Sequence, residues 1–338
     1  MEASAFAKAM ADKTAGQARK NTKREGLRRR KIMIKIHVIE KAMYEAMRLA
    51  VTRLPPDVEV ALKNALAEET ELLAIEHLKS CLKNAHLAKS GQGLVCGDTG
   101  FPLFYVKIGP GVEIEGGIPA ILRVAQTATE KATAESFLRP TMVDPLTRKN
   151  PGNNLGPGMP KVEILYGGKN KQLEIIAVPK GGGSEIFGTF YRMLFPTDGK
   201  TGIKKFIIEC IKDSCYAGKI CPPAIIGIGI GGTADLCMKL AKEAALLRVV
   251  GEHNPDPETA QLEKELLDAA RRLGIGPMGS RGINCVMDIH IEKAVTHTAA
   301  LPVAVNAQCM VGRRWKAAIA DNGKISYSGK ISNWKKGM

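Results

Sequence analysis

The chain contains no hydrophobic run long enough to span a membrane. Even the apolar segment at residues 222–232 is short and interrupted by glycine, whereas a transmembrane helix needs about 18–20 apolar residues in a row. The sequence also has no low-complexity linker after residue 35 and no internal repeat with a period of about 20–50 residues. We therefore expect residues 33–338 to form one large soluble domain.

The sequence has no C-x-x-C pair, the spacing that marks many compact zinc sites. It also lacks the apolar core of a secretion signal. The eight cysteines are therefore expected to be reduced thiols of a cytoplasmic protein, not a disulfide framework. Any thiolates that act together must be brought together by the fold.

Two glycine-rich segments differ from common nucleotide-binding motifs. KGGGS at residues 180–184 follows a strand-like run, but its lysine precedes the glycines, unlike the lysine of G-x-x-x-x-G-K-[ST]. GIGIGG at residues 227–232 resembles the dinucleotide fingerprint G-x-G-x-x-G only superficially, because the additional Gly231 falls between the second and third glycines of that pattern. We interpret the first segment as a backbone-amide nest for an anion and the second as close packing beside Cys221.

Positive charge is concentrated at the N-terminus. The net charge is +15, and residues 1–32 contain ten Lys or Arg against three acidic residues. We expect this basic tail to be disordered, because charged segments of low hydrophobicity cannot bury a core. A nucleic-acid-binding arm is an alternative, since clustered cations release counterions from phosphates, although Phe6 is its only aromatic residue. A targeting peptide and a translation start at Met33 also remain open.

Hydrophobic periodicity predicts an α/β fold, with a helical N-terminal part followed by a mixed sheet flanked by helices. The first helix is expected at residues 38–54, where Pro55 and Pro56 end it, and the second at residues 58–89, with Asp57 as its N-cap. Strands are expected at residues 103–108, 173–178, 225–230, 286–291 and 301–305. Later helices are expected at residues 118–134, 202–215, 234–247 and 257–273.

Three distant segments each combine a cysteine with glycine, proline or small polar residues. They are CGDTG at Cys96, CPPAIIGIGIGGTAD at Cys221 and NAQCMVGRR at Cys309. Small residues and tight turns let the backbone approach a bulky group closely, with polar groups directed at it. Taken singly, however, a free cysteine is more often a small buried hydrophobic side chain.

Together with LRP at Arg139, PKGGGSE at residues 179–185 and THTAALP around His297, these segments resemble the iron–sulfur hydro-lyases of the class I fumarase and L-tartrate dehydratase family. The resemblance covers residues 34–320. It implies that Cys96, Cys221 and Cys309 hold a [4Fe-4S] cluster with one open, Lewis-acidic iron. It also implies a beta subunit that carries a C-terminal domain, since this sequence ends about where that domain would begin.

The resemblance implies roles for five further residues. Asp98 and His297 would relay a proton to the departing hydroxide, which needs a pKa near ambient pH. Arg139 would bind a substrate carboxylate through two parallel hydrogen bonds, and Gly182 and Gly183 would also bind the substrate. On residue type alone, Asp98 equally fits an Asx-turn and an isolated histidine is usually structural.

The expected function is the alpha subunit of a fumarate hydratase of the tricarboxylic acid cycle, which hydrates fumarate to malate. The alternative is an L(+)-tartrate dehydratase alpha subunit. From other classes, a basic nucleic-acid-binding protein and a zinc-stabilised scaffold are weighed, although neither nucleic acid nor a membrane is expected as a partner. The base that removes the C3 proton of the substrate is expected on the beta subunit. Two features depart from the family: Met310, Val311 and Gly312 replace a polar run, and the end WKKGM is basic.

Overall fold

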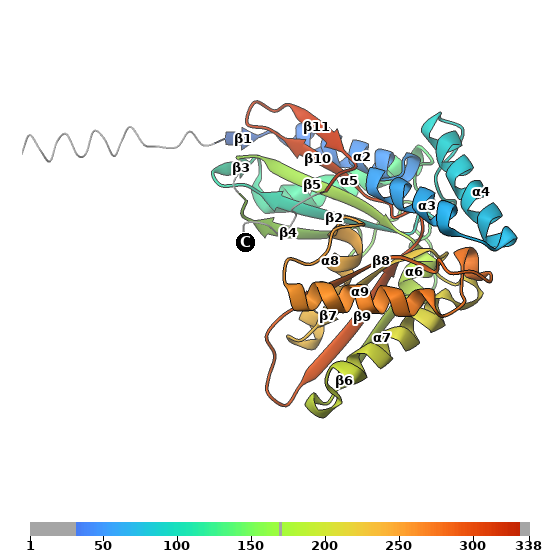
Figure 1. Cartoon of the computed structure of the whole chain (residues 1–338). Coiled ribbons are helices and arrows are strands. Elements are labelled where there is room, and N and C mark those ends of the chain that lie inside the picture. The colour runs from blue at the N-terminus through green and yellow to red at the C-terminus, as the bar shows by residue number, and fades with distance from the viewer. Residues whose placement is uncertain (1–31, 169–170, 332–338) are drawn as a thin grey trace, which may run out of the picture.

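The computed structural model describes residues 32–168 and 171–331 (Figure 1). The fold is mixed α/β, with N-terminal helices followed by sheets flanked by helices, which confirms the predicted class. The single sheet that we expected is instead two main sheets. One has five strands in the order β11-β10-β5-β2-β4, and the other has four in the order β6-β9-β7-β8. A short parallel pair, β1 with β3, completes the strands of the described residues.

The helices are α2 (Ile36–Thr52), α3 (Pro56–Glu68), α4 (Leu72–Lys89), α5 (Gly117–Ala134), α6 (Gly182–Ile186), α7 (Gly199–Cys215), α8 (Ala234–Leu247) and α9 (Pro257–Arg271). The strands are β1 (Ile32–Ile34), β2 (Phe101–Ile108), β3 (Val112–Ile114), β4 (Lys161–Tyr166), β5 (Leu173–Lys180), β6 (Thr189–Leu194), β7 (Ala224–Ile230), β8 (Val286–Lys293), β9 (Leu301–Gln308), β10 (Trp315–Ile319) and β11 (Ile325–Ser328). Short 3-10 turns lie at Pro196–Asp198, Tyr216–Gly218 and Pro277–Gly279.

Helices α2 and α5 pack on one face of the five-stranded sheet. The buried side chains Ile39, Met43 and Met47 recur every four residues along α2 and so form one apolar face. They join Phe104 and Ile175 of the central strands β2 and β5 in one hydrophobic core. This core positions the ends of β2 and β5, which carry two of the predicted motifs.

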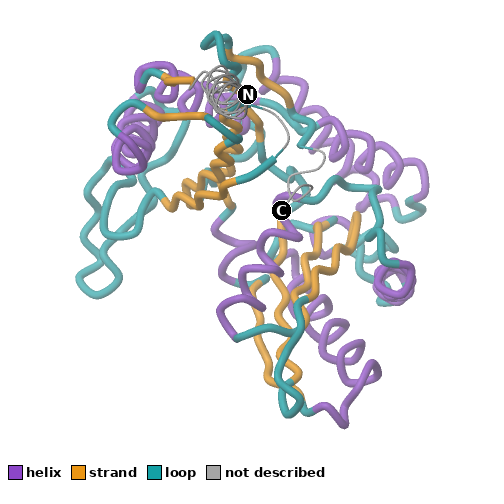
Figure 2. Tube along the Cα trace, turned by 90° about the vertical axis from the view of Figure 1, so that its left-hand side faces the viewer, coloured by secondary structure: helices purple, strands orange, loops and turns teal. Residues whose placement is uncertain are grey.

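Helix α8 lies between the two sheets (Figures 1 and 2). Its Leu246 and Leu247 pack against Ile176 and Val178 of the five-stranded sheet. On its other side, a Cβ on Gly229 of β7 would lie 2.0 Å from the Cys237 carbonyl oxygen of α8. Gly227 and Gly229 of GIGIGG are therefore required for helix packing, since a side chain at either position would push α8 away from β7.

The predicted helix at residues 58–89 is wrong as a single element. The chain bends between α3 and α4 at Glu69, whose carboxylate accepts hydrogen bonds from the amides of Thr70 and Ile283 and from the Asn284 side chain. Asp57 is also not the N-cap, a position that Pro55 occupies. The bend at Glu69 and the start of α3 both depend on contacts with residues that are distant in the sequence. Local helix propensity does not include such contacts.

Several strands were not anticipated from the sequence, namely β4, β6, β10 and β11 and the short pair β1 and β3. Strand β10 pairs antiparallel with β5, so residues 315–328 complete the five-stranded sheet. Strand β1 begins at Ile32, the last residue of the predicted basic tail. Residues 1–31 and the basic C-terminal end lie outside the described residues.

Across the two described ranges, no helix combines the length and apolar character that crossing a bilayer requires.

Candidate active site

The topology brings four of the predicted motifs to adjoining strand ends. In the five-stranded sheet, Phe101 at the start of β2 pairs with Lys180 at the end of β5. The loop of Cys96 and Asp98 precedes β2, and the glycines of KGGGS follow β5, so both lie at one edge. In the four-stranded sheet, Ile225 of β7 pairs with Gln308 of β9, which places Cys221 and Cys309 at one edge as well.

The three predicted cysteines lie in one neighbourhood, where Cys96 and Cys221 pack against the hydrophobic cluster that contains Cys309. The Met310 amide donates a hydrogen bond of 3.1 Å to the Cys221 carbonyl oxygen and so ties the two cysteine segments together. Burial, together with negative charge on Cys309 and Cys96, raises the pKa of Cys221 to about 11. Burial also raises the pKa of Cys96. Such thiols ionise readily only when a cation takes up the thiolate charge.

The residues present fit an iron–sulfur cluster better than a single metal ion. All the described cysteines are free thiols. No group of three or more His, Cys, Asp or Glu side chains in the described parts of the chain is arranged around one ion, so the zinc hypothesis gains no support. In a four-iron cluster each thiolate binds a different iron, and the sulfurs need not converge on one point. Moreover, the buried Arg313 guanidinium has no hydrogen-bond partner among the described residues, which suits a bulky anionic group.

Asp98 is joined to both the cysteine loop and the glycine segment. Its amide hydrogen-bonds the Cys96 sulfur, and its Oδ2 accepts a hydrogen bond of 2.7 Å from the Gly182 amide. A Cβ on Gly182 would lie 3.1 Å from this same oxygen, so a side chain there would crowd the carboxylate. In this structure the Gly182 amide therefore binds Asp98 and holds its carboxylate beside Cys96.

Gly183 faces the second sheet. A Cβ at this position would lie 2.9 Å from the Lys219 carbonyl oxygen, in the loop that leads to Cys221. The glycine segment is thus the point where the backbones of the two cysteine-bearing sheets approach each other. We infer that a side chain at Gly183 would separate Cys221 from Cys96.

Arg139 lies beside the Cys96 loop and keeps its side chain exposed. Its amide donates to Thr99 Oγ1 at 2.8 Å, and its Nη1 donates to the Gly97 carbonyl oxygen at 3.2 Å. The buried Asn154 supports this segment, because its Nδ2 donates to the Arg139 carbonyl oxygen at 2.9 Å. Arg139 is therefore held at the site with a guanidinium that an incoming carboxylate can reach.

His297 is not brought to the cysteines within one chain. It is exposed in the loop between β8 and β9, where its Nδ1 accepts a hydrogen bond from the Ala299 amide at 3.1 Å. Cys309 follows the far end of β9, which is eight residues long. At about 3.3 Å per residue, the strand separates the two residues by roughly 26 Å. The joint proton relay of His297 with Asp98 does not form within this single chain.

Sequence reasoning missed the structural role of Lys180, which is completely buried. Its Nζ donates to Ser184 Oγ and to the Ala307 carbonyl oxygen, both at 2.7 Å, and lies 3.5 Å from Glu185. Burial lowers its pKa to about 8, against the opposing effect of the Glu185 charge. Lys180 thus connects the end of β5 with β9. The sequence did contain a signal for this role, because Lys180 stands at the end of an apolar run that is typical of a buried strand.

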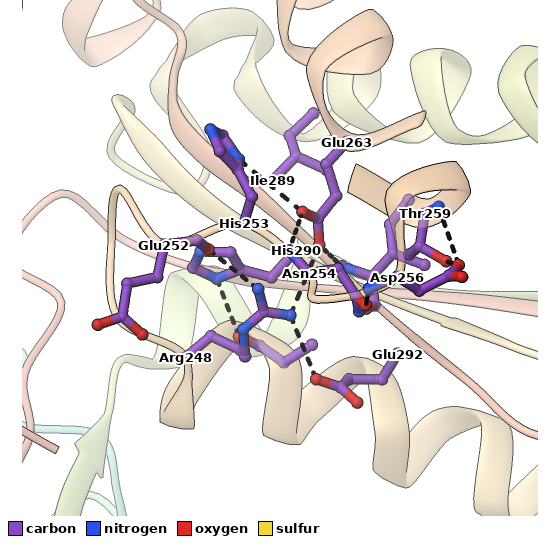
Figure 3. Close-up of polar contacts among 12 residues, drawn as sticks. Arg248, Glu252, His253, Asn254, Asp256, Thr259, Glu263, Ile289, His290 and Glu292 are labelled. Carbon is purple, nitrogen blue, oxygen red and sulfur yellow. Dashed lines mark hydrogen bonds and ion pairs between the residues drawn. The ribbon is translucent and has the colours of Figure 1, made fainter. Parts of the chain in front are cut away.

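A second polar group, around Arg248 and Glu263, anchors the loop between α8 and α9 (Figure 3). The buried Glu263 carboxylate accepts hydrogen bonds from the amides of Asn254 and Ile291 at 2.9 and 2.8 Å. Arg248 Nη1 lies 3.5 Å from Glu263 and 3.2 Å from Glu292. None of the predicted site residues belongs to this group, and we interpret it as structural.

Comparison with known proteins agrees with this arrangement. The family model described as Fumarate hydratase (Fumerase) matches residues 40–318. The chain is 43% identical over 277 residues to a putative L(+)-tartrate dehydratase subunit alpha of Methanocaldococcus jannaschii, covering 82% of this chain and 95% of that protein. It is 34% identical over 265 residues to the L(+)-tartrate dehydratase subunit alpha of Escherichia coli UTI89, covering 78% and 84%. The chain therefore belongs to the class I fumarate hydratase and L-tartrate dehydratase alpha subunit family of hydro-lyases.

Proposed function

We propose that this chain is the alpha subunit of an L(+)-tartrate dehydratase. The observation that carries the chemistry is the meeting of the Cys96, Cys221 and Cys309 segments beside Asp98 and Arg139. The choice of substrate rests on the relatives, because those at 43% and 34% identity are named as tartrate dehydratase alpha subunits. Fumarate hydration is the second candidate, because the matching family model is described as Fumarate hydratase; a place in the tricarboxylic acid cycle belongs to that alternative.

Cys96, Cys221 and Cys309 are the proposed holders of a [4Fe-4S] cluster. When bound, this cluster supplies an iron that acts as a Lewis acid toward the hydroxyl group that leaves. The protein holds the three sulfurs at the ends of rigid strands, which keeps the binding groups in place before the cofactor arrives. The buried position of Cys309, only 7% exposed, limits the access of water to it.

Asp98 is the proposed proton-transfer group on this chain. Its carboxylate lies next to Cys96 and is oriented by the Gly182 amide, so it has a defined direction before the substrate binds. A carboxyl group held in this way can exchange a proton with the departing hydroxyl. Arg139, fixed by the Gly97 carbonyl oxygen, binds one carboxylate of the diacid and sets the distance between the substrate and Asp98.

A beta subunit is the proposed partner, because the relatives are named as alpha subunits. We place on it the base that removes the C3 proton. The exposed side chains of Ile186, at the end of α6, and of Phe187, directly after it, support an interface near the site. Association there would exclude water from the reacting groups.

The test is a comparison of substrates with the anaerobically purified complex of alpha and beta subunits. We expect kcat/KM for the dehydration of L(+)-tartrate to exceed that for the hydration of fumarate by about 100-fold or more, because a site built to bind both hydroxyls discriminates against a substrate that lacks them. The Cys96→Ser variant serves as the inactive control. A preference for fumarate would overturn the choice of substrate and leave the hydro-lyase chemistry intact.

A further inference from the structure

Within the part of the chain that the structure describes, Arg313 is a buried arginine without a polar partner. Its side chain is 1% exposed, and its Nε, Nη1 and Nη2 atoms all lack a hydrogen-bond partner among the described residues. The adjacent Arg314 is equally buried, but it forms an ion pair with Asp57. A buried charge normally persists only when it is paired. Among the described residues, Arg313 therefore lacks the negatively charged partner that Arg314 has in Asp57.

The guanidinium of Arg313 lies among the three cysteine segments. A Cβ on Gly181 would be 3.3 Å from Arg313 Nη2 and 3.7 Å from Cys309 Sγ, so both atoms face the same point of the backbone. The positive charge of Arg313 also lowers the pKa values of Cys96 and Cys221, against the larger effect of burial. The charge is thus close to all three sulfurs.

We propose that Arg313 binds the iron–sulfur cluster of the proposed function, as the cation that compensates its negative charge. A cluster held by three thiolates is anionic and presents sulfur atoms that accept hydrogen bonds. The five donors of a guanidinium suit several such acceptors at once. The inference rests on the cluster site of the proposed function and adds to it a positioning residue to which the motif analysis assigned no role.

Two measurable consequences follow from this role. First, the loss of Arg313 should weaken the hold on the cluster, because the pairing of a buried charge is removed. Second, it should lower the reduction potential of the cluster, since reduction adds negative charge that the nearby cation stabilises. A purely structural arginine would affect the thermal stability of the protein without shifting the potential.

The experiment uses the full chain with its beta subunit, loaded with cluster under anaerobic conditions. Iron release to a chelator and the midpoint potential of the cluster are measured for Arg313→Met, Arg313→Lys and the unmodified protein. We expect Arg313→Met to release iron about tenfold faster than the unmodified protein, as the loss of one charged hydrogen bond predicts. The midpoint potential of its cluster should also be lower. Arg313→Lys should keep most of the potential, because the charge remains, while iron release is faster than in the unmodified protein.

Arg248→Met is the matched control for general destabilisation. Arg248 is a mostly buried, paired arginine, and Glu292, with which it pairs, aligns with Gly229 toward the end of β7 that is remote from Cys221. This variant should unfold at a lower temperature but keep the iron-release rate and the potential, measured well below unfolding.

Unchanged iron release and potential in Arg313→Met would overturn the proposal. If Arg313→Met fails to fold, Arg313→Lys decides alone, because unchanged iron release in that variant contradicts a hydrogen-bonding role. An unmodified protein that takes up no iron would instead contradict the proposed function, so the two failures are distinguishable.

Discussion

At the scale of residues, the site is built from side chains whose neighbours explain their position. Asp98 is held by Gly182, Arg139 by Gly97, and the cysteines by the turns that precede or follow a strand. The resemblance to the family located all of these residues, and Cys96, Asp98 and Cys221 also lie next to glycine or proline shortly before a strand. The burial of Arg313 and Lys180 was not predicted, since a basic residue in a sequence is normally assumed to lie at the surface.

The first prediction concerns the cluster ligands. Replacement of Cys96, Cys221 or Cys309 by Ser should abolish the cluster, because serine does not replace the soft thiolate that iron–sulfur centres require. Cys81→Ser is the matched control, since Cys81 packs against the same hydrophobic cluster and its thiol has a pKa raised to about 12, mainly by burial. Iron and acid-labile sulfide are measured after anaerobic reconstitution. A full cluster in any of the first three variants would remove that cysteine from the ligand set.

The second prediction concerns proton transfer. Asp98→Asn should keep the iron content and lower kcat by about 10²- to 10⁴-fold, the usual effect of losing an acid–base group. The amide oxygen of asparagine can still accept the Gly182 hydrogen bond, so the loop should remain in place. Steady-state kinetics and iron analysis are carried out on the same preparation. Loss of iron with unchanged turnover per cluster would make Asp98 a structural residue.

The third prediction concerns substrate binding. Arg139→Lys should raise KM for the diacid more than it changes iron content, because a lysine ammonium cannot form the two parallel hydrogen bonds of a guanidinium. Arg123→Lys, on the exposed face of α5, is the control for loss of a surface guanidinium. An unchanged KM would show that Arg139 does not bind the substrate.

At the scale of elements, helix α8 determines how the two sheets meet. Its small residues lie against the glycines of β7, and its leucines lie against β2 and β5. The sequence predicted both α8 and β7, but it did not show that one helix serves two sheets. The strand β6 and the strands β10 and β11 were missed as well, because their short runs carry weak periodic signals.

The fourth prediction tests this contact. Gly229→Ala should destabilise the protein by about 1–3 kcal/mol, the usual cost of overpacking, because its Cβ would lie 2.0 Å from the Cys237 carbonyl oxygen. Gly156→Ala is the control, since no atom lies within 4 Å of its added Cβ, and it should change stability by less than about 0.5 kcal/mol. Equilibrium unfolding in urea measures both. Equal stability of the two variants would show that α8 can shift at no cost.

At the scale of the whole molecule, the described chain brings together one side of an active site. Asp98, Arg139 and the cysteines converge, whereas His297 lies at the other end of β9. For His297 to act beside Asp98, the β8–β9 loop of a second copy of this chain would have to reach the site. The role of His297 therefore stays a prediction. The base for the C3 proton is likewise expected from the beta subunit.

The fifth prediction is that the cluster-loaded alpha chain is inactive without the beta subunit. We expect less than about 1% of the activity of the complex, since loss of a general base alone costs about 10²- to 10⁴-fold. L(+)-tartrate dehydration is measured with the alpha chain alone and after titration with the beta chain. Full activity of the alpha chain alone would require the base to lie within this sequence.

The sequence by itself determined the fold class, the family and the motifs at the cysteines. These features depend on local patterns: strands and helices have their own periods, and close approach to a large group demands small residues at fixed places. Only the tertiary structure decided that there are two sheets, that Arg313 is buried beside the cysteines and that His297 is remote from them. The physical reason is that these properties depend on how α8 and the strand ends pack across long separations in the chain, which no local pattern encodes.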